Sequence, residues 1–227
     1  MLPFRQEQAH GSAGVLHGWS PPTDPIVTVR RCRADRAALV LGSRQGEELL
    51  DPAGVTGAGL EIVRRASGGG IVLVDDTVAV WVDVWLPSGA SSVTYDVRGS
   101  MEAVGSAWLT ALAAADPDLA GHLSIHEGPV SRGAWEELLC FAGLGPGEVL
   151  LDGRKLVGLS QRRTREWSRV QCQVFTGNPS ASAAALIAES HRPDDPVPDD
   201  PARVPRDVVE SAAAALAGHL AEQLTDR

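Results

Sequence analysis

The stretch Arg64-Arg65-Ala66-Ser67-Gly68-Gly69-Gly70 lies directly between two apolar runs, Leu60–Val63 and Ile71–Val74. Three consecutive glycines are unfavourable inside a strand, because they lose much backbone entropy on folding and pack no side chain. A bare backbone between two strands is typical of a loop whose N–H groups contact a ligand. The two arginines favour an anionic ligand, because a guanidinium binds phosphate or carboxylate through paired hydrogen bonds. A flexible loop between strands is the alternative.

A second informative segment, residues 148–163, predicts a β-hairpin. Two mainly apolar runs, Glu148–Leu151 and Lys155–Leu159, flank the residues Asp152-Gly153-Arg154. Asp-Gly is a favoured two-residue hairpin turn, because both of its positions accept positive φ. The turn would place Lys155 on the returning strand, where ladder hydrogen bonds hold the backbone in a defined position. An exposed lysine on the strand surface is the alternative.

Hydrophobic periodicity predicts the remaining elements. Residues 77–85 have valine at every second position, from Val78 to Val84, and this period of two is typical of a strand. Residues 100–115 carry apolar side chains at three- and four-residue spacing, which predicts a helix. Further strands are expected at residues 26–32, 37–41, 60–65, 71–74 and 167–175, further helices at 181–190 and 207–224, and loops at 1–25 and 51–59. Many strands in hairpins, with helices segregated from them, predict an α+β fold.

The composition excludes several classes of function. A net charge of -9 argues against a general nucleic-acid binder. No apolar stretch approaches the roughly 20 residues of a membrane helix, and the first 25 residues lack the apolar core of a secretory signal. Three cysteines without CxxC spacing indicate reduced thiols in a cytoplasmic protein. Histidine spacing predicts no metal site held by protein ligands.

Together, the quoted segments resemble the lipoate-protein ligase A/octanoyltransferase family, which shares the biotin/lipoate protein ligase catalytic domain. That family carries R-R-x-S-G-G-G followed by a few apolar residues and an acid, here Asp75. It later carries a D/E-G-R-K run that ends in G-S-A/S-Q-R, and residues 152–162 match this run except that Leu159 stands before Ser160-Gln161. A weaker match covers residues 39–45. The resemblance implies a mixed, mostly antiparallel sheet with flanking helices, like that of class II aminoacyl-tRNA synthetases and biotin ligases. It also implies a ligase that uses ATP and Mg²⁺ to form an acyl-AMP from lipoate or octanoate. The acyl group would pass to a lysine of a lipoyl carrier domain, either in a 2-oxoacid dehydrogenase acyltransferase subunit or in the glycine-cleavage H protein.

The resemblance assigns roles to individual residues. Lys155 would stabilise the negative charge that develops in both steps, an effect worth roughly 10²–10³ in rate for one well-placed donor. The expected substrate-binding residues are Arg64, Arg65, Ser67, Gly68, Gly69, Gly70, Asp75, Gly158, Gln161 and Arg162. Residues 1–190 would form the catalytic domain, residues 191–205 a linker rich in proline and aspartate, and residues 206–227 a C-terminal helix.

Two other functions remain open from the sequence. Cys140-Phe141 stands 15 residues before Lys155 (155 − 140), a spacing similar to that of octanoyltransferases that form an acyl thioester without ATP. A buried, inert thiol is the alternative interpretation of Cys140. The third possibility is a catalytically degenerate homologue that binds an acyl or adenylate ligand. Val74 stands where the family has histidine, and Gln171–Val174 replaces a His-Gly segment, which favours this third possibility.

Overall fold

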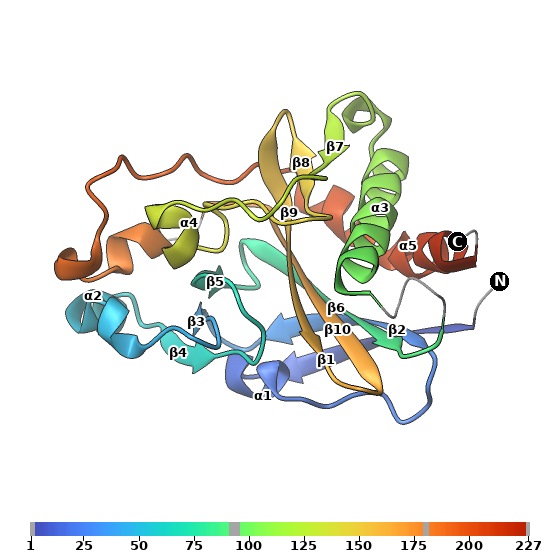
Figure 1. The fold of residues 1–227 in the computed structure, drawn as a ribbon, viewed down its shortest axis with the longest axis horizontal. Helices are drawn as coiled ribbons and strands as arrows, with labels where there is room; N and C mark the ends of the chain where they lie inside the picture. Colours follow the sequence, from blue (N-terminus) through green and yellow to red (C-terminus); the bar gives the residue numbers. More distant parts are fainter. Residues whose placement is uncertain (1–2, 91–95, 179–181, 226–227) are drawn as a thin grey trace.

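The computed structural model describes residues 3–90, 96–178 and 182–225. Its main element is a seven-stranded sheet (Figure 1) in which only the edge pair β1–β2 is parallel and every other pair is antiparallel. The strands, in spatial order, are β1 (Phe4–Gly11), β2 (Val27–Ala34), β6 (Ala79–Pro87), β10 (Trp167–Phe175), β9 (Arg154–Arg163), β8 (Val149–Leu151) and β7 (Leu123–Ile125).

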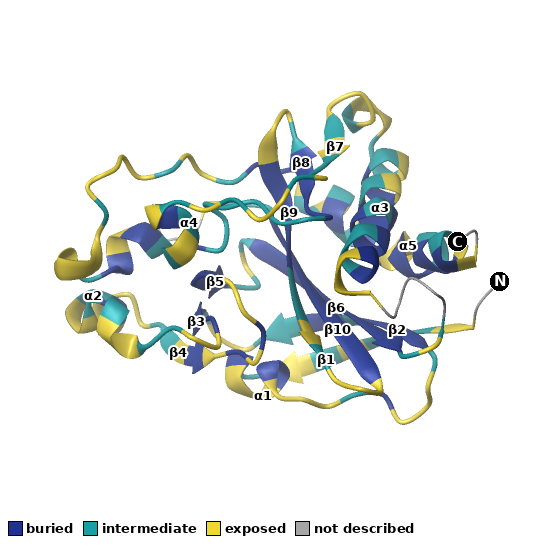
Figure 2. Cartoon of the chain, viewed as in Figure 1, coloured by how far each residue is buried: buried dark blue, intermediate teal, exposed yellow. Residues whose placement is uncertain are grey.

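One face of this sheet is covered by helices α3 (Val97–Ala115) and α5 (Arg206–Thr225), which pack against each other (Figure 1). Alternation along β6 turns Val80, Val82 and Val84 toward the helices, where all three are buried. Full burial of such a side chain contributes about 1.5–3 kcal/mol, so this interface forms the principal core. Strands β6 and β10 are buried along their whole length (Figure 2).

The opposite face of the large sheet packs against a small sheet in the order β4 (Glu61–Arg64), β3 (Ala38–Leu41), β5 (Val72–Val74). Strand β3 is parallel to β4 and antiparallel to β5. Apolar side chains of the small sheet meet Trp81 of β6 in a second core. The outer side of the small sheet is covered by η1 (Glu47–Leu49), α2 (Pro52–Gly57), α4 (Ala134–Leu138) and η4 (Ala183–Leu186). The remaining elements are α1 (Ala13–His17), η3 (Pro117–Leu119) and η5 (Glu189–His191).

The structure confirms the predicted α+β class, with a mostly antiparallel sheet and flanking helices. The predicted hairpin is also confirmed. Strands β8 and β9 pair in antiparallel fashion, and Asp152 and Gly153 between them have φ values of 49° and 78°. Positive φ at both central positions is the conformation that the Asp-Gly sequence favours. Lys155 is therefore fixed one residue inside β9.

Three predictions of local structure were wrong. The predicted loop at residues 1–25 contains the edge strand β1 and the short helix α1, because an edge strand with one neighbour requires little apolar patterning. The predicted loop at 51–59 contains α2, which the Asp51 side chain caps. The predicted helix at 181–190 is replaced by the 3₁₀ turns η4 and η5, and residue 181 itself lies outside the described residues.

The segment 191–205 contacts the rest of the chain at several points. The Ala202 N–H donates to the Lys155 carbonyl oxygen at 2.8 Å, and the Trp135 indole N–H donates to the Asp195 carbonyl oxygen at 2.9 Å. Val204 is buried in the principal core. The division into a catalytic domain, linker and C-terminal helix stays a prediction. The last two residues of that predicted helix, 226 and 227, lie outside the described residues.

Candidate active site

A cavity lies between the two sheets, at the place where the glycine-rich loop and the hairpin meet. Its walls come from the small sheet, from β6, β9 and β10 of the large sheet, from α1, and from the segment 138–142 that follows α4. The lining residues are His17, Arg65, Val72, Val74, Trp81, Cys140, Phe141, Gly158, Leu159, Ser160, Gln171, Cys172 and Gln173. One part of this lining is apolar and the other carries neutral polar groups and one cation.

The glycine-rich loop owes its course to the topology of the small sheet. Strands β4 and β5 pair with opposite edges of β3, so the chain between them crosses the end of β3. There the Ser43 N–H donates to the Ser67 carbonyl oxygen at 3.0 Å. A Cβ on Gly42 would lie 1.9 Å from the Gly69 carbonyl oxygen. The weaker motif at residues 39–45 therefore packs against the glycine-rich loop at the end of β3.

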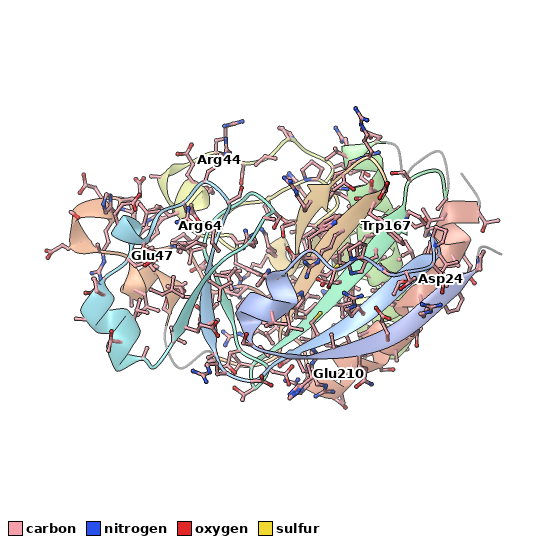
Figure 3. All side chains as sticks on the ribbon, turned by 90° about the horizontal axis from the view of Figure 1, so that it is seen from below. Asp24, Arg44, Glu47, Arg64, Trp167 and Glu210 are labelled. Atoms are coloured by element: carbon pink, nitrogen blue, oxygen red, sulfur yellow. The ribbon has the colours of Figure 1, made fainter. Side chains whose placement is uncertain are left out.

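The two motif arginines occupy different environments, because neighbouring residues at the end of a strand point to opposite sides. Arg65 is buried, and its guanidinium donates to the carbonyl oxygens of Gly68 at 2.9 Å and Gly70 at 2.8 Å. No carboxylate in the described part of the chain pairs with Arg65. Arg64 is exposed on the surface of the small sheet (Figure 3). Arg65 is thus a buried cation in the cavity wall, and no carboxylate of the described residues pairs with it.

Ser67 connects the two motifs directly. Its hydroxyl lies 3.1 Å from the Ser160 hydroxyl of β9 and donates to the Gln171 side-chain oxygen of β10, also at 3.1 Å. Ser67 is buried, so these bonds satisfy a hydroxyl that has no access to water. The glycine-rich loop is therefore joined to two adjacent strands of the large sheet.

Gly70 packs against the backbone of the segment after α4. A Cβ at Gly70 would lie 2.6 Å from the Leu139 carbonyl carbon, closer than real Cβ atoms approach. The next residue, Ile71, donates to the Leu138 carbonyl oxygen at 2.6 Å and accepts from the Cys140 N–H at 2.8 Å. Close approach of the protein's own backbone therefore accounts for Gly70. Around Gly68, by contrast, a Cβ would meet nothing within 4 Å.

Lys155 contacts the segment after α4 from the side opposite to Gly70. Its ammonium donates to the Cys140 carbonyl oxygen at 2.7 Å and forms an ion pair with Glu148, also at 2.7 Å. The two side chains are only 4% and 3% exposed. Glu148 also accepts from the N–H groups of Gly145 at 2.7 Å and Leu159 at 3.0 Å. A buried pair of this kind is held rigidly, because both charges lose water and need fixed partners.

The Phe141 ring lies beside Lys155 and fills the space that Gly158 leaves. The Lys155 Nζ is 5.3 Å from the centre of the ring, and a Cβ on Gly158 would lie 2.7 Å from its edge. The ring also packs edge-on against Phe175, with centroids 4.9 Å apart. Phe141 lines the first cavity and also a second one, bounded by residues 71–73, 139–142 and 197–201. Lys155 itself lines neither cavity, whereas the Phe141 ring beside it lines both.

Four predicted substrate-binding residues, Arg64, Asp75, Gln161 and Arg162, do not line this cavity, and their side chains are exposed or bonded elsewhere. Asp75 accepts from the N–H and hydroxyl of Thr77 and forms a turn. The Gln161 amide donates to the Ser168 hydroxyl, while Arg162 and Arg64 are exposed. Arg65, Gly158 and Cys140 line the cavity. Lys155, Ser67 and Gly70 do not line it but contact residues that do, and Gly68 and Gly69 are exposed on the adjoining loop.

The three thiols differ in their surroundings. Cys140 is half-buried and lines the cavity. Burial raises the pKa of the Cys172 thiol far above its ordinary value. Burial, followed by the charge of Asp83, raises the pKa of the Cys32 thiol as well. Cys32 and Cys172 are thus inert core residues, because the thiolate is the reactive form of cysteine.

The model of the lipoyl protein ligase A/B catalytic domain matches residues 22–224. The chain belongs to this family. A search of curated proteins by sequence found no match. The family assignment therefore rests on the match across nearly the whole chain, and it agrees with the motifs that meet at the cavity.

Solved structures show the same fold. A putative lipoate protein ligase from Thermoplasma acidophilum with bound lipoic acid is 16% identical, with a TM-score of 0.64 over 89% of this chain and 74% of that one. A lipoate-protein ligase A bound with ATP is 17% identical, with a TM-score of 0.63 over the same shares. An archaeal bipartite lipoate protein ligase, studied with its E2 lipoyl domain, is 17% identical, with a TM-score of 0.62 over 99% and 85%. At these identities the likeness shows the lipoyl protein ligase fold alone.

Sequence reasoning missed two residues of this candidate site. Glu148 was counted only as the start of an apolar run, although a carboxylate in such a run requires a buried partner. His17 lies in a segment that carried no motif. One further signal was available, because Lys155 is the only lysine in the sequence. All other basic side chains of the Lys/Arg type are arginines, and the single lysine is buried.

Two features are absent from the described residues. No group of three or more histidine, cysteine, aspartate or glutamate residues within 3–90, 96–178 and 182–225 could hold a metal ion. No helix in the same ranges has the length and apolarity needed to cross a membrane.

Proposed function

We propose that the protein is an ATP-dependent ligase that joins lipoate or octanoate to a lysine of a lipoyl carrier domain. In the first step a carboxylate oxygen of the fatty acid attacks the α-phosphorus of ATP, which forms acyl-AMP and releases pyrophosphate. In the second step the carrier amine attacks the acyl carbonyl carbon, which forms an amide and releases AMP and a proton. The family match and the similar folds of ligases solved with lipoic acid or ATP support this proposal.

The observation that carries the proposal is the position of the only lysine. An ammonium has three N–H donors, and two of them bind the Cys140 carbonyl and Glu148. The third is left for an oxygen of the ligand once the Phe141 ring turns aside. Negative charge develops on phosphate oxygens in the first step and on a carbonyl oxygen in the second. A fixed donor in a water-poor site stabilises both, because it needs little reorganisation.

Arg65 supplies the charge that attracts the acyl carboxylate. Its guanidinium is buried, and among the described residues it bonds only neutral carbonyl oxygens of its own loop. A buried cation without a counterion is unfavourable, and an anionic ligand relieves this cost. Val72, Val74 and Trp81 offer an apolar wall for the alkyl chain.

The second cavity is the proposed place for the nucleotide. Leu139, Phe141 and Phe175 give it an apolar wall, which suits a flat base. Asp199, Asp200 and Arg203 line it, and Arg203 pairs with Asp200, so Asp199 leaves a net negative charge there. The phosphates should therefore lie toward the glycine-rich loop. We expect Mg²⁺ to arrive with ATP, because Mg²⁺ in such sites is held mainly by phosphate oxygens and water.

The acceptor that we propose is a lipoyl domain of a 2-oxoacid dehydrogenase acyltransferase subunit, or the glycine-cleavage H protein. The structure of an archaeal ligase studied with its E2 lipoyl domain supports this class of partner. We further propose a cytoplasmic location, where the three free thiols would remain reduced.

A second function is favoured by one observation, the half-buried Cys140 thiol in the cavity wall. In that case the protein would be an octanoyl- or lipoyltransferase. The Cys140 thiolate would attack the thioester carbonyl of an acyl carrier protein and release the carrier thiol. The lysine of the lipoyl domain would then attack the new thioester on Cys140. This step would form the amide and release the Cys140 thiolate. No ATP would be consumed.

One assay separates these functions. Apo lipoyl domain is incubated with the protein and either lipoate with Mg·ATP or octanoyl acyl carrier protein, and intact-protein mass spectrometry detects the acyl adduct. The ligase proposal predicts product only in the first mixture, and product that persists in Cys140→Ala. Product only in the second mixture, lost in Cys140→Ala and kept in the buried-thiol control Cys32→Ala, would establish the transferase. Ligand binding without product in either mixture would indicate a degenerate homologue.

The role of Arg65 has a matched control in its neighbour. Arg65→Met should raise the KM for lipoate by at least 10-fold, because the buried charge near the carboxylate is lost. Arg64→Met removes an adjacent, exposed charge and should leave KM unchanged. Equal effects of the two substitutions would contradict the assignment of Arg65 to the carboxylate.

A further inference from the structure

His17 has a ring nitrogen without a partner in the wall of the first cavity. The residue ends α1, is 9% exposed and stacks on Trp81, with ring centroids 4.4 Å apart. Its Nε2 is buried and forms no hydrogen bond with any described residue. Most buried polar atoms are paired, so an unpaired one that borders a cavity calls for an explanation.

The hydrogen-bond network fixes where the His17 proton lies. The Ser67 hydroxyl donates to the Gln171 side-chain oxygen, so the Gln171 amide nitrogen faces His17 and donates to its Nδ1 at 3.1 Å. Because Nδ1 accepts, the proton of the neutral ring is on Nε2. Burial, with the charges of Arg169 and Arg65, lowers the pKa of His17 to about 3, so the ring is neutral near pH 7. Nε2 is therefore an N–H donor.

Packing alone does not account for a histidine at this position. Stacking on Trp81 requires only a flat ring, which phenylalanine supplies without an unpaired donor. Leaving a buried donor unsatisfied costs about 1–3 kcal/mol. Arg65, which lines the same cavity, attracts an anionic or polarised oxygen. A ligand oxygen held there would accept from both groups.

We propose that His17 binds the substrate by donating its Nε2–H to an oxygen of the acyl head group. This inference rests on the proposed function, since the ligand is the lipoyl or octanoyl carboxylate and the acyl carbonyl derived from it. A neutral donor suits both the carboxylate oxygen of the free acid and the uncharged carbonyl oxygen of the acyl group. Arg65, by contrast, favours the charged carboxylate. His17 lies outside residues 22–224, which match the family, so this donor comes from the chain's own N-terminal segment.

Two ligands separate the roles of His17 and Arg65. Octanoate has both a carbonyl oxygen and a charge, and octanamide has the oxygen without the charge. Calorimetric titration of the full chain should show that His17→Phe weakens both by about 10-fold, the loss expected for one hydrogen bond of about 1.4 kcal/mol. Arg65→Met should weaken octanoate much more than octanamide. The control His10→Phe makes the same change on the exposed edge strand and should leave both affinities unchanged.

A spectroscopic measurement tests the contact itself. In ¹⁵N-histidine-labelled protein, the Nε2–H of His17 should give a correlation that stays in the neutral tautomer from pH 5 to 8 and shifts when octanoate or octanamide is added. A purely structural histidine would keep its chemical shift. His17→Gln, which can place an amide N–H in the same region, should recover part of the affinity lost in His17→Phe.

The outcomes distinguish this inference from the function on which it rests. If wild-type protein binds octanoate and the His17→Phe protein, folded by near-ultraviolet circular dichroism, binds it equally well, the role of His17 is refuted and the ligase proposal stands. If wild-type protein binds neither ligand, both proposals are refuted.

Discussion

Two buried ion pairs in the large sheet differ in how completely their cations are satisfied. Arg169 of β10 pairs with Asp83 of β6 at 2.5 Å, and the side chains are 2% and 0% exposed. The guanidinium also donates to the carbonyl oxygens of Leu16, His17 and Gly18, and it lies 5.1 Å from the centre of the Trp85 ring. Every N–H of the fork has an acceptor. This pair fixes α1 against the sheet.

Lys155 and Glu148 form the other pair, with equally little exposure. Here the carboxylate is saturated by two backbone N–H groups and the ammonium, whereas the ammonium keeps one N–H without a described partner. The comparison teaches that burial alone does not identify a functional charge. The distinguishing feature is an N–H without a described partner next to the Phe141 ring, which lines both cavities, and Arg169 has no such N–H.

The largest expected effect is the fall in the free energy of unfolding when the Arg169–Asp83 pair is broken. Arg169→Met leaves Asp83 buried without a counterion and frees three carbonyl oxygens, so the free energy of unfolding should fall by about 3–5 kcal/mol. Chemical denaturation measures this change. The double variant Arg169→Met/Asp83→Asn should recover part of the loss. A change below 1 kcal/mol in the single variant would contradict the structural role.

Replacement of the single lysine should act mainly on catalysis. Lys155→Met should lower kcat for lipoyl transfer by about 10²–10³, or about 3–4 kcal/mol in barrier height. Because this change also leaves Glu148 unpaired, the double variant Lys155→Met/Glu148→Gln controls for folding. It should regain thermal stability without regaining activity. The exposed control Arg162→Met should have nearly wild-type kcat.

Displacement of Phe141 tests whether the ring separates Lys155 from the cavities. Gly158→Ala would place a Cβ 2.7 Å from the ring edge, so the ring must move. We expect a cost of about 1–3 kcal/mol in the free energy of unfolding, typical of overpacking, and a change in the KM for lipoate. Phe141→Leu gives the added methyl group room, so Gly158→Ala in that background should cost less. Equal cost in both backgrounds would show that Phe141 is not the obstacle.

The pH dependence of stability caused by His17 is the smallest expected effect when it is measured over a single pH unit. Its pKa is about 3 in the folded protein and near 6.5 when unfolded, so the unfolded chain binds more protons between these values. Stability should therefore fall as the pH drops from about 6.5 to about 3, by up to about 1.4 kcal/mol per pH unit. The slope should decrease in His17→Phe and stay unchanged in His10→Phe, as measured by urea unfolding across this range.

Local patterns in the sequence predicted much of the frame. Alternating valines in β6 and the Asp-Gly turn before Lys155 carry their structural cause within a few residues. Strand β1 gave no such signal, because its pairing with β2 depends on backbone groups and its side chains remain largely polar. The 3₁₀ turn η4 lies in an alanine-rich segment with high helix propensity, and contacts with α2 override that propensity.

The candidate site was predictable only where motif residues line the cavity or contact the residues that line it. Arg65, Ser67 and Lys155 come from the two motifs, and the fold brings these motifs together through Ser160 and Cys140. Alternation along the chain separates Arg64 from Arg65, which a motif alone does not reveal. His17 and Glu148 reach the site through packing between elements distant in sequence, and that packing depends on the whole topology.

The single lysine permits a direct test of the central claim that Lys155 and the glycine-rich loop act on one acyl head group. Protein labelled with ¹³Cε-lysine gives one side-chain resonance, which can be followed while a non-hydrolysable octanoyl-adenylate analogue is added. We predict a shift that saturates with the calorimetric affinity and that requires at least 10-fold more analogue in Arg65→Met than in Arg64→Met. A resonance that stays unchanged while calorimetry records binding would contradict the account.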